Sequence, residues 1–202
     1  MKKNKIIKTT LIICLILLIV YAIYIIYQYN MINNLYELGK NVPQFNNIYF
    51  NTKSQDANIT YYKLNNTVKI NIENSSNNEN ILAWNNYETN EYCTLFSQTQ
   101  TYSTEHCVEY SIPYFYTTNN DITFKDKFLF ALNPFKNISS IKYNGYDCYK
   151  YEVNGQTSYI DKNTFIVVYE KTDEKVSTTE YTINSVEEKD VSKPDTNDFL
   201  LK

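Results

Sequence analysis

The sequence predicts an α+β fold in which an N-terminal transmembrane helix precedes a curled antiparallel β-sheet with a leading helix and a short inserted helix. Three observations support this prediction. Residues 11–27 contain no charged side chain and follow a lysine-rich start. Most of the remaining chain consists of short β-rich runs separated by polar turns. Residues 28–45 and 122–132 instead space their apolar residues as helices do.

Length and composition limit the class of protein. A chain of 202 residues, 43% of them hydrophobic, suits one domain with a packed core plus an appendage. The 21 tyrosines and the absence of arginine, together with abundant Asn and Lys, indicate an AT-rich coding sequence. We therefore assign no functional meaning to the Asn-rich and lysine-only character of the chain.

Residues 11–27 are the predicted membrane anchor. With the two threonines before them, they approach the roughly 20 apolar residues that cross a bilayer as a helix. The four lysines near the anchor all lie in residues 1–10. This one-sided charge predicts a cytoplasmic stub, 1–10, and an extracytoplasmic domain, 28–202. The predicted location is the cell membrane, crossed once with the N-terminus inside.

Two alternatives to an uncleaved anchor stay open. A cleaved signal peptide has the same charged start but needs small residues at its cleavage site, whereas residues 23–27 are bulky. A lipoprotein signal would use Cys14, but Ile13 stands before it where a small residue is usual. In the anchor reading, Cys14 is an apolar residue of the membrane helix.

The predicted outer domain is acidic. Residues 28–202 hold 15 lysines and 22 acidic residues, a net charge of −7. Because an acidic surface repels polyanions, we do not expect nucleic acid as a partner.

The first helix of the outer domain is expected over 28–45, where Ile32, Leu35 and Leu38 recur at helical spacing before Pro43. A short helix is expected over 122–132, with Asp121 or Thr123 as its cap. Apolar alternation predicts strands elsewhere. These strands are 48–50, 59–64, 68–72, 81–84, 91–97, 102–110, 141–143, 146–153, 157–160, 165–169 and 174–184.

Turn chemistry joins these strands into hairpins. Asn144-Gly145 and Asn154-Gly155 are typical of two-residue hairpin turns, and Asn65-Asn66 suits the same role because Asn tolerates the left-handed region. Asp161-Lys-Asn-Thr164 is the predicted turn between 157–160 and 165–169. Adjacent hairpins of this kind form an antiparallel meander, and a sheet of about ten strands must curl.

The order of elements, together with Tyr159-Ile-Asp-Lys-Asn-Thr-Phe165 and the closing segment 191–199, resembles the LolA-like superfamily. These are lipoprotein carriers and related bacterial cell-envelope proteins. The likeness covers roughly residues 30–200. It implies a half-barrel domain over 28–202 with a concave apolar cavity able to hold an acyl chain or a partner's hydrophobic segment. The residues expected to line this cavity are Tyr61, Ile70, Trp84, Phe96, Phe128, Phe165 and Val167.

Three cysteines lie in the predicted outer domain, where an oxidising environment permits disulfides. Cys93 and Cys107 fall in neighbouring predicted strands, and a bond between them would stabilise the fold by about 3 kcal/mol. We expect this pair to form. Pairings with Cys148, or no bond at all, stay open.

No residue pattern indicates catalysis, a metal or a cofactor. His106 is the only histidine. Cys107 beside it would point to the opposite face of a strand, so the two are not a catalytic pair. One histidine with scattered carboxylates does not predict a zinc site.

These observations leave two main hypotheses of function. The first is a membrane-anchored envelope protein that binds a lipid or a lipoprotein-like hydrophobic ligand. The second is a non-enzymatic sensor or interaction module that binds another envelope protein. A hydrolase ranks below both, because nothing beyond His106 supplies a general base.

Overall fold

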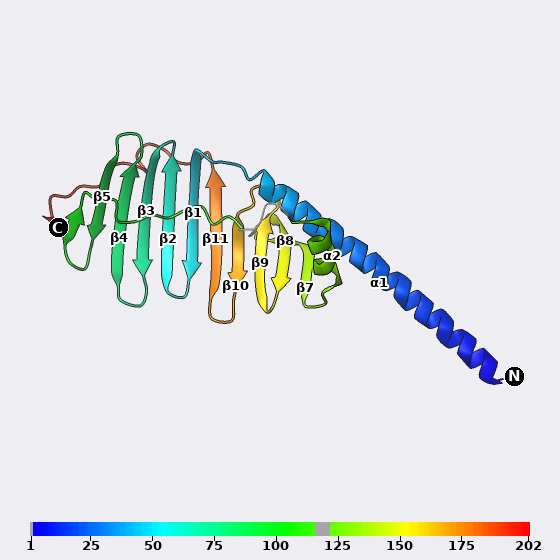
Figure 1. Ribbon diagram of the computed structural model, residues 1–202. Coiled ribbons are helices and arrows are strands. Elements are labelled where there is room, and N and C mark those ends of the chain that lie inside the picture. Colours follow the sequence, from blue (N-terminus) through cyan, green and yellow to red (C-terminus); the bar gives the residue numbers. More distant parts are fainter. Residues whose placement is uncertain (1, 116–121) are drawn as a thin grey trace.

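The computed structural model describes residues 2–115 and 122–202. One long helix, α1 (Lys2–Lys40), leads into a large open sheet (Figure 1). The α+β class predicted from the sequence is therefore confirmed, with the long apolar helix at the N-terminus. The strands are β1 (Asn47–Ser54), β2 (Ala57–Leu64), β3 (Thr67–Asn74), β4 (Glu79–Asn86), β5 (Glu91–Phe96), β6 (Thr101–Ser103), β7 (Lys136–Tyr143), β8 (Tyr146–Val153), β9 (Gln156–Asp161), β10 (Val167–Lys171), β11 (Val176–Ile183) and β12 (Leu200–Leu201).

The sheet consists of two meanders joined at their inner strands. Its strand order is β12-β6-β5-β4-β3-β2-β1-β11-β10-β9-β8-β7. The join is the antiparallel pair of β1 with β11, which runs from Ile48 opposite Ile183 to Ser54 opposite Ser177. Within the described chain, the short pair of β12 with β6 is parallel, and the other ladders are antiparallel.

The hairpin turns follow the predicted chemistry. Asn144 and Gly145 have φ values of 47° and 88°, and Asn154 and Gly155 have values of 51° and 85°. Positive φ at both turn positions matches the right-handed twist of the flanking strands. Asn65 also lies in the left-handed region. The predicted hairpins β2–β3, β7–β8 and β8–β9 are confirmed.

The expected anchor and leading helix are one continuous helix. α1 passes through residues 27 and 28 without a break and ends at Lys40, where the backbone N–H of Asn41 bonds the carbonyl of Leu38. Side chains from residue 7 to residue 27 are mostly exposed, whereas Met31, Ile32 and Leu35 are buried. They pack against a core that includes Phe130, Ile138, Ile160 and Phe165. The last three turns of α1 are therefore part of the sheet domain.

Gln28 lies where the side chains of α1 change from exposed to buried, and its amide bonds the edge strand β7. Strand β7 is the last strand of the order, so one side of its backbone has no neighbouring strand. The N–H of Ile138 donates to Oε1 of Gln28 at 2.8 Å. In return, Nε2 of Gln28 donates to the Ile138 carbonyl at 3.1 Å. The same nitrogen also donates to Oδ1 of Asn137 at 2.8 Å. Gln28 is 1% exposed. Its amide thus replaces a missing strand at one residue of the edge.

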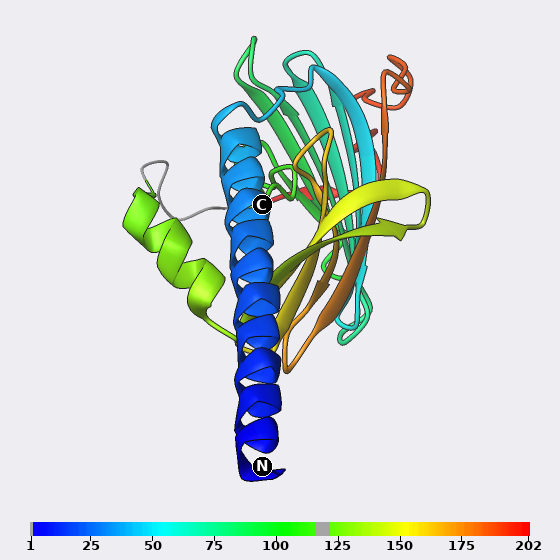
Figure 2. The same ribbon diagram turned by 90° about the vertical axis from the view of Figure 1, so that its right-hand side faces the viewer.

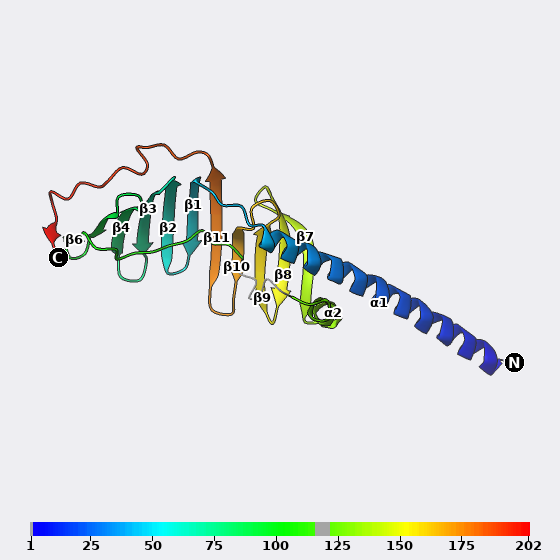
Figure 3. The same ribbon diagram turned by 45° about the horizontal axis from the view of Figure 1, so that its top comes forward.

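Two irregular segments cross the sheet on opposite faces (Figure 3). Residues 104–115 run from β6 back toward β10, and Tyr110, Ile112 and Tyr114 pack on the face that carries Phe50 and Tyr61. The prediction of one strand over 102–110 is therefore wrong beyond Ser103. The chain leaves the ladder there because it must return across the sheet to start the second meander at β7.

The tail after β11 crosses the other face. Nε1 of Trp84 donates to the Val191 carbonyl at 2.7 Å, and Phe199 packs near Leu95 and Cys93. The tail ends as β12 beside β6. Both faces of the first meander are therefore covered by their own chain.

Helix α2 (Phe124–Leu132) follows the first crossing and packs against α1 (Figure 2). Its N-terminus is a capping box, in which Thr123 and Asp126 each bond the other's backbone N–H. Asp121, the other expected cap, lies outside the described residues.

The turn at Asp161 to Thr164 joins β9 to β10 as predicted. Oδ1 of the buried Asp161 accepts from the N–H groups of Asn163 at 2.6 Å and Thr164 at 3.2 Å. Phe165 follows with a φ of 64°, a conformation that costs a bulky residue about 1–3 kcal/mol. It is held there by burial against Phe115 and by the bond from the N–H of Phe115 to its carbonyl.

The Gln28→Leu variant tests the edge bond. Leucine has a similar size but leaves the N–H and carbonyl of Ile138 without these partners, so we expect a loss of about 2–4 kcal/mol of unfolding free energy. The measurement is denaturant unfolding of the full chain in detergent, followed by fluorescence of Trp84. The control is Asn30→Leu, at an exposed position on the same helix. Equal midpoints for the two variants would contradict the role assigned to Gln28.

Candidate functional site

The seven residues expected to line one cavity are distributed over the whole sheet. Tyr61 and Ile70 are buried beneath the crossing segment 104–115, and Phe165 is buried near the end of α1. Trp84 lies on the opposite face, under the tail. Phe96 is half-buried under Lys202, Phe128 is exposed on α2, and Val167 lines a small pocket. The structure does not bring these seven together, because they lie on opposite faces of the sheet and on α2.

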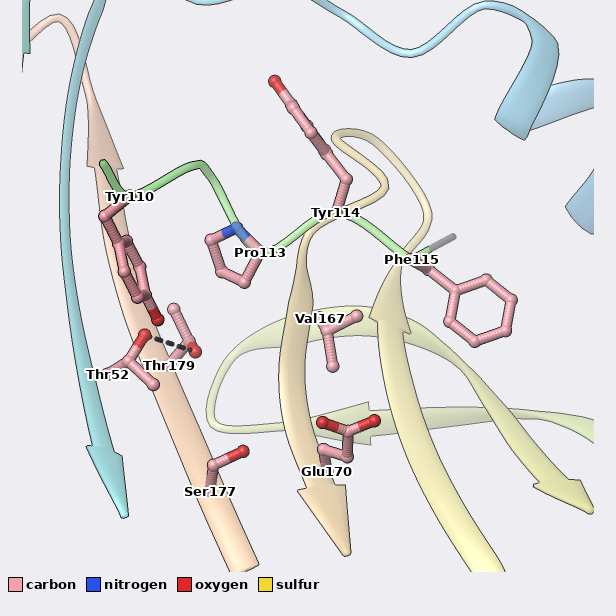
Figure 4. Close-up of a pocket in the computed structure, with 9 residues that line it drawn as sticks. All are labelled: Thr52, Tyr110, Pro113, Tyr114, Phe115, Val167, Glu170, Ser177 and Thr179. Atoms are coloured by element: carbon pink, nitrogen blue, oxygen red, sulfur yellow. Dashed lines mark hydrogen bonds between the residues drawn. The ribbon is translucent and has the colours of Figure 1, made fainter. Parts of the chain in front are cut away.

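The pocket at Val167 lies between the crossing segment and strands β1, β10 and β11 (Figure 4). Its volume is about 350 Å³. Hydroxyl groups form one side, where Thr52 and Thr179 share a hydrogen bond of 2.9 Å across the β1–β11 join. The other lining residues are Tyr110, Pro113, Tyr114, Phe115, Glu170 and Ser177.

The groups that line this pocket include hydroxyls, aromatic rings and one carboxylate. Burial raises the pKa of Tyr110, so its hydroxyl stays protonated at neutral pH. Glu170 is exposed, and the lining residues include no histidine or cysteine. A nucleophile paired with a base is therefore not present among the residues that line it. The pocket can accept a small group that has both apolar and hydrogen-bonding parts.

A larger pocket lies between α1, α2 and the strands β7 and β8. Its volume is about 580 Å³, within the range of ligand sites. Ile32 and Tyr36 of α1, Leu129 and Phe130 of α2, and Tyr151 of β8 form its apolar walls. We call it the α1–α2 pocket. Its remaining lining residues are Ile122, Asp126, Lys127, Asn133 and Lys136.

The polar residues of the α1–α2 pocket are mostly engaged with neighbours. Nζ of Lys127 donates to Oδ1 of Asn33 at 2.6 Å, and Nζ of Lys136 lies 5.7 Å from the centre of the Phe130 ring. Asp126 is part of the capping box of α2. Burial raises the pKa of Tyr151 to about 12 and also raises that of Tyr36. Both phenols are therefore neutral, and the walls of the pocket carry no buried charge of their own.

The expected disulfide between Cys93 and Cys107 is not formed, and all four cysteines are free thiols. Cys93 pairs across the ladder with Trp84 and is buried with it under the tail. Cys107 lies in the segment that crosses the other face, and its Sγ bonds Oγ of Ser103 at 3.2 Å. The sheet stands between the two sulfurs. The prediction was wrong because it placed Cys107 in a strand next to that of Cys93.

His106 also lies in this crossing segment and is exposed. Its ring contacts those of Tyr92 at 4.9 Å and Tyr87 at 6.1 Å. Over residues 2–115 and 122–202, no group of three His, Cys, Asp or Glu side chains is arranged to hold a metal ion.

No family model matches the chain, and no curated protein matches it.

Sequence reasoning missed Gln28 and most residues of the α1–α2 pocket. Gln28 is a polar residue at the end of an apolar run, and its distance from the edge strand in sequence, 110 residues, hides its role. Tyr36 and Phe130 were visible only as apolar positions of two separate helices. The sequence predicts an apolar face on each helix, but it does not predict that the two faces contact each other.

Thiol labelling tests the placement of the cysteines. In a Cys14→Ser background, we expect a maleimide to modify Cys107 quickly, and to modify Cys93 and Cys148 only after unfolding, because both are buried. Peptide mapping by mass spectrometry reads the result, with the urea-unfolded chain as control. A Cys93–Cys107 peptide linkage in the oxidised folded protein would contradict the structure.

The buried thiol of Cys148 predicts that the unfolding free energy depends on pH. Burial raises the pKa of Cys148 from 9.0 to about 12. Below pH 9 the thiol is protonated in both the folded and the unfolded state. As the pH rises from 9 toward 12, only the unfolded state ionises, so the folded state loses stability. Cys148→Ala should show a smaller loss than the parent chain when unfolding is measured at pH 8 and pH 10.

Proposed function

We propose that the chain is a membrane-anchored, extracytoplasmic envelope protein whose LolA-like half-barrel binds a lipid chain or a hydrophobic segment in the α1–α2 pocket. One observation carries the proposal. The same helix supplies both the apolar span and a wall of the pocket, because α1 continues unbroken from the exposed apolar residues to Ile32 and Tyr36. An acyl chain in the bilayer is therefore close to the pocket.

The anchor rests on the length and character of α1. It is long and apolar enough to cross a membrane. Its side chains from Leu11 to Ile26 are largely exposed, and no described part of the sheet domain covers most of them. The lysine-rich start supports a cytoplasmic N-terminus and an outer sheet domain.

The order of elements supports the LolA-like part of the proposal. A leading helix, a first meander, a helix at the crossover and a second meander follow one another along the chain. The second meander ends on β11, which pairs with β1. Residues of both helices pack in one core with Ile138 of β7 and Ile160 of β9. In the proposed orientation, the α1–α2 pocket is at the membrane-facing end of the domain.

The pocket combines apolar walls with polar and charged residues. Its walls are aromatic and aliphatic, and its lysines lie at the side of α2 and at the start of β7. A ligand with an apolar chain and an anionic end would match this combination, since lysine side chains extend a charged tip beyond an apolar stem. The pocket at Val167 is smaller and is less accessible from α1.

Photo-crosslinking with lipids tests the proposal. The full chain is placed in nanodiscs that contain a phospholipid with a diazirine at the end of one acyl chain. We expect crosslinks at Tyr36, Phe130 or Tyr151 in addition to those along residues 7–27. Tyr36→Glu should reduce the crosslinks to the pocket roughly tenfold or more, because a buried unpaired carboxylate is costly next to an acyl chain.

The matched control is Asn34→Glu, which adds the same charge at an exposed position two residues earlier. It should leave the crosslinks unchanged. Crosslinks restricted to residues 7–27 in the parent chain, with the domain folded by circular dichroism, would rule out lipid binding in the pocket.

A second candidate function, a protein-interaction module, is favoured by the far end of the sheet. There β12 is two residues long, and both Leu200 and Leu201 are exposed. These two exposed leucines form a small apolar surface that another envelope protein can contact. A photoreactive residue in place of Leu200 would capture such a partner in cells, and a residue in place of exposed Tyr87 serves as the control.

A further inference from the structure

Helix α2 and the turn after it expose a cluster of large apolar side chains. Phe124 is 70% exposed, Phe128 41%, Leu129 53% and Phe135 79%. We call these four residues the α2 patch. Phe124 and Phe128 stack on each other, with ring centres 6.1 Å apart, while the opposite side of α2 buries Phe130 and Ala131 in the core. An exposed group of this kind marks a surface that contacts a partner or a membrane.

The α2 patch lies beside the point where α1 changes from exposed to buried. The hydroxyl of Tyr21 is 3.5 Å from the Leu132 carbonyl at one end of α2. The ring of Tyr29 is 5.5 Å from that of Phe124 at the other end. Tyr21 and Tyr29 are about 12 Å apart along the axis of α1. This stretch contains the change from exposed Tyr27 to buried Gln28.

The figures show the same relation. Figure 1 shows α2 and β7 at the end of the sheet that lies next to the projecting part of α1. Figure 2 shows α2 alongside α1, with the N-terminal half of α1 extending beyond the domain. If α1 crosses the bilayer over residues 11–27, the Phe124 end of α2 lies just outside the span, beside Tyr29, and the Leu132 end lies within it, beside Tyr21.

The side chains near the patch suit that boundary. Tyr21, Tyr24 and Tyr27 are exposed on the stretch of α1 that lies beside α2, and aromatic residues are enriched at the interfaces of membrane proteins. Lys125, Lys127 and Lys136 flank the patch in a domain whose net charge is −7. The one acidic residue of α2, Asp126, is held by the capping box. This surface therefore attracts anionic lipid headgroups more than the rest of the acidic domain does.

We propose that the α2 patch is a second membrane contact, seated in the outer headgroup and acyl boundary of the bilayer that α1 crosses. This proposal rests on the anchoring and orientation given under the proposed function. With α1 alone, the sheet domain can turn about the helix axis relative to the lipid. With two contacts its orientation is fixed, and the α1–α2 pocket is held next to the acyl chains. The patch is continuous with the span, which is why the bilayer, and not another protein, is its occupant.

Quenching by brominated lipids tests this proposal on the full chain. Phe135→Trp and Phe128→Trp each add one tryptophan to the patch and keep an aromatic ring. Each variant is placed in vesicles of phosphatidylcholine and phosphatidylglycerol, with and without bromine on the acyl chains near the headgroup. We expect a roughly twofold loss of the added emission, because interfacial helices bury their apolar face about 5–10 Å into this boundary.

Three controls separate the outcomes. The unsubstituted chain gives the background from Trp84, which is buried under the tail. Leu17→Trp reports whether α1 is inserted. Tyr87→Trp, at an exposed position on the first meander, should not be quenched. Circular dichroism of each variant shows that it is folded.

Quenching in Leu17→Trp and in both patch variants, but not in Tyr87→Trp, supports the proposal. Quenching in Leu17→Trp without quenching in the patch variants overturns it while the anchor stands. If the patch tryptophans are not quenched by brominated lipids and are also shielded from aqueous acrylamide, protein covers the patch. That outcome also overturns the proposal. No quenching in Leu17→Trp would show that the anchor itself is wrong, and this proposal fails with it.

Discussion

The pairing of β1 with β11 is the constraint on which the rest of the structure depends. It joins the first strand of one meander to the last strand of the other over seven residue pairs, from Ile48 with Ile183 to Ser54 with Ser177. Along this join Phe50 is fully buried, and Thr52 and Thr179 share a buried hydrogen bond. Because the two joined strands are in the middle of the sheet, each meander grows outward from them, and their far ends, β6 and β7, lie at opposite edges.

This constraint explains both crossing segments. The chain leaves β6 at one end of the sheet and must reach β7 at the other, so residues 104–115 return over one face. After β11 the chain is again in the middle, and the tail returns over the opposite face to end beside β6. Tyr110 and Ile112 fill the first face, and Trp84 is covered on the second. Phe50, Tyr61 and Trp84 of the first meander are therefore buried, and the larger described pocket is at the other end, next to α1 and α2.

A single helix joins an apolar segment of membrane-spanning character to this domain. The exposed part of α1 has the character of a membrane span, and its last turns bury Ile32 and Leu35. Gln28 lies at the change between the two and bonds the free edge of β7. A soluble domain that begins after Gln28 would lose these bonds, since a buried edge without partners is costly. The apolar part of α1 and the sheet domain are therefore joined by one continuous helix.

The sequence by itself determined what depends on near neighbours. Apolar alternation predicted most strands, and the left-handed preference of Asn and Gly predicted turns such as 144–145 and 154–155, because these effects act within a few residues. The uncharged run 11–27 predicted a helix of membrane-spanning character. Only the tertiary structure decided which strands pair across the chain, that residues 104–115 leave the ladder, and that Cys93 and Cys107 lie on opposite faces. The α1–α2 pocket belongs to the second group, since Tyr36 and Phe130 meet through contacts between segments almost a hundred residues apart, and no local pattern encodes the register of such contacts.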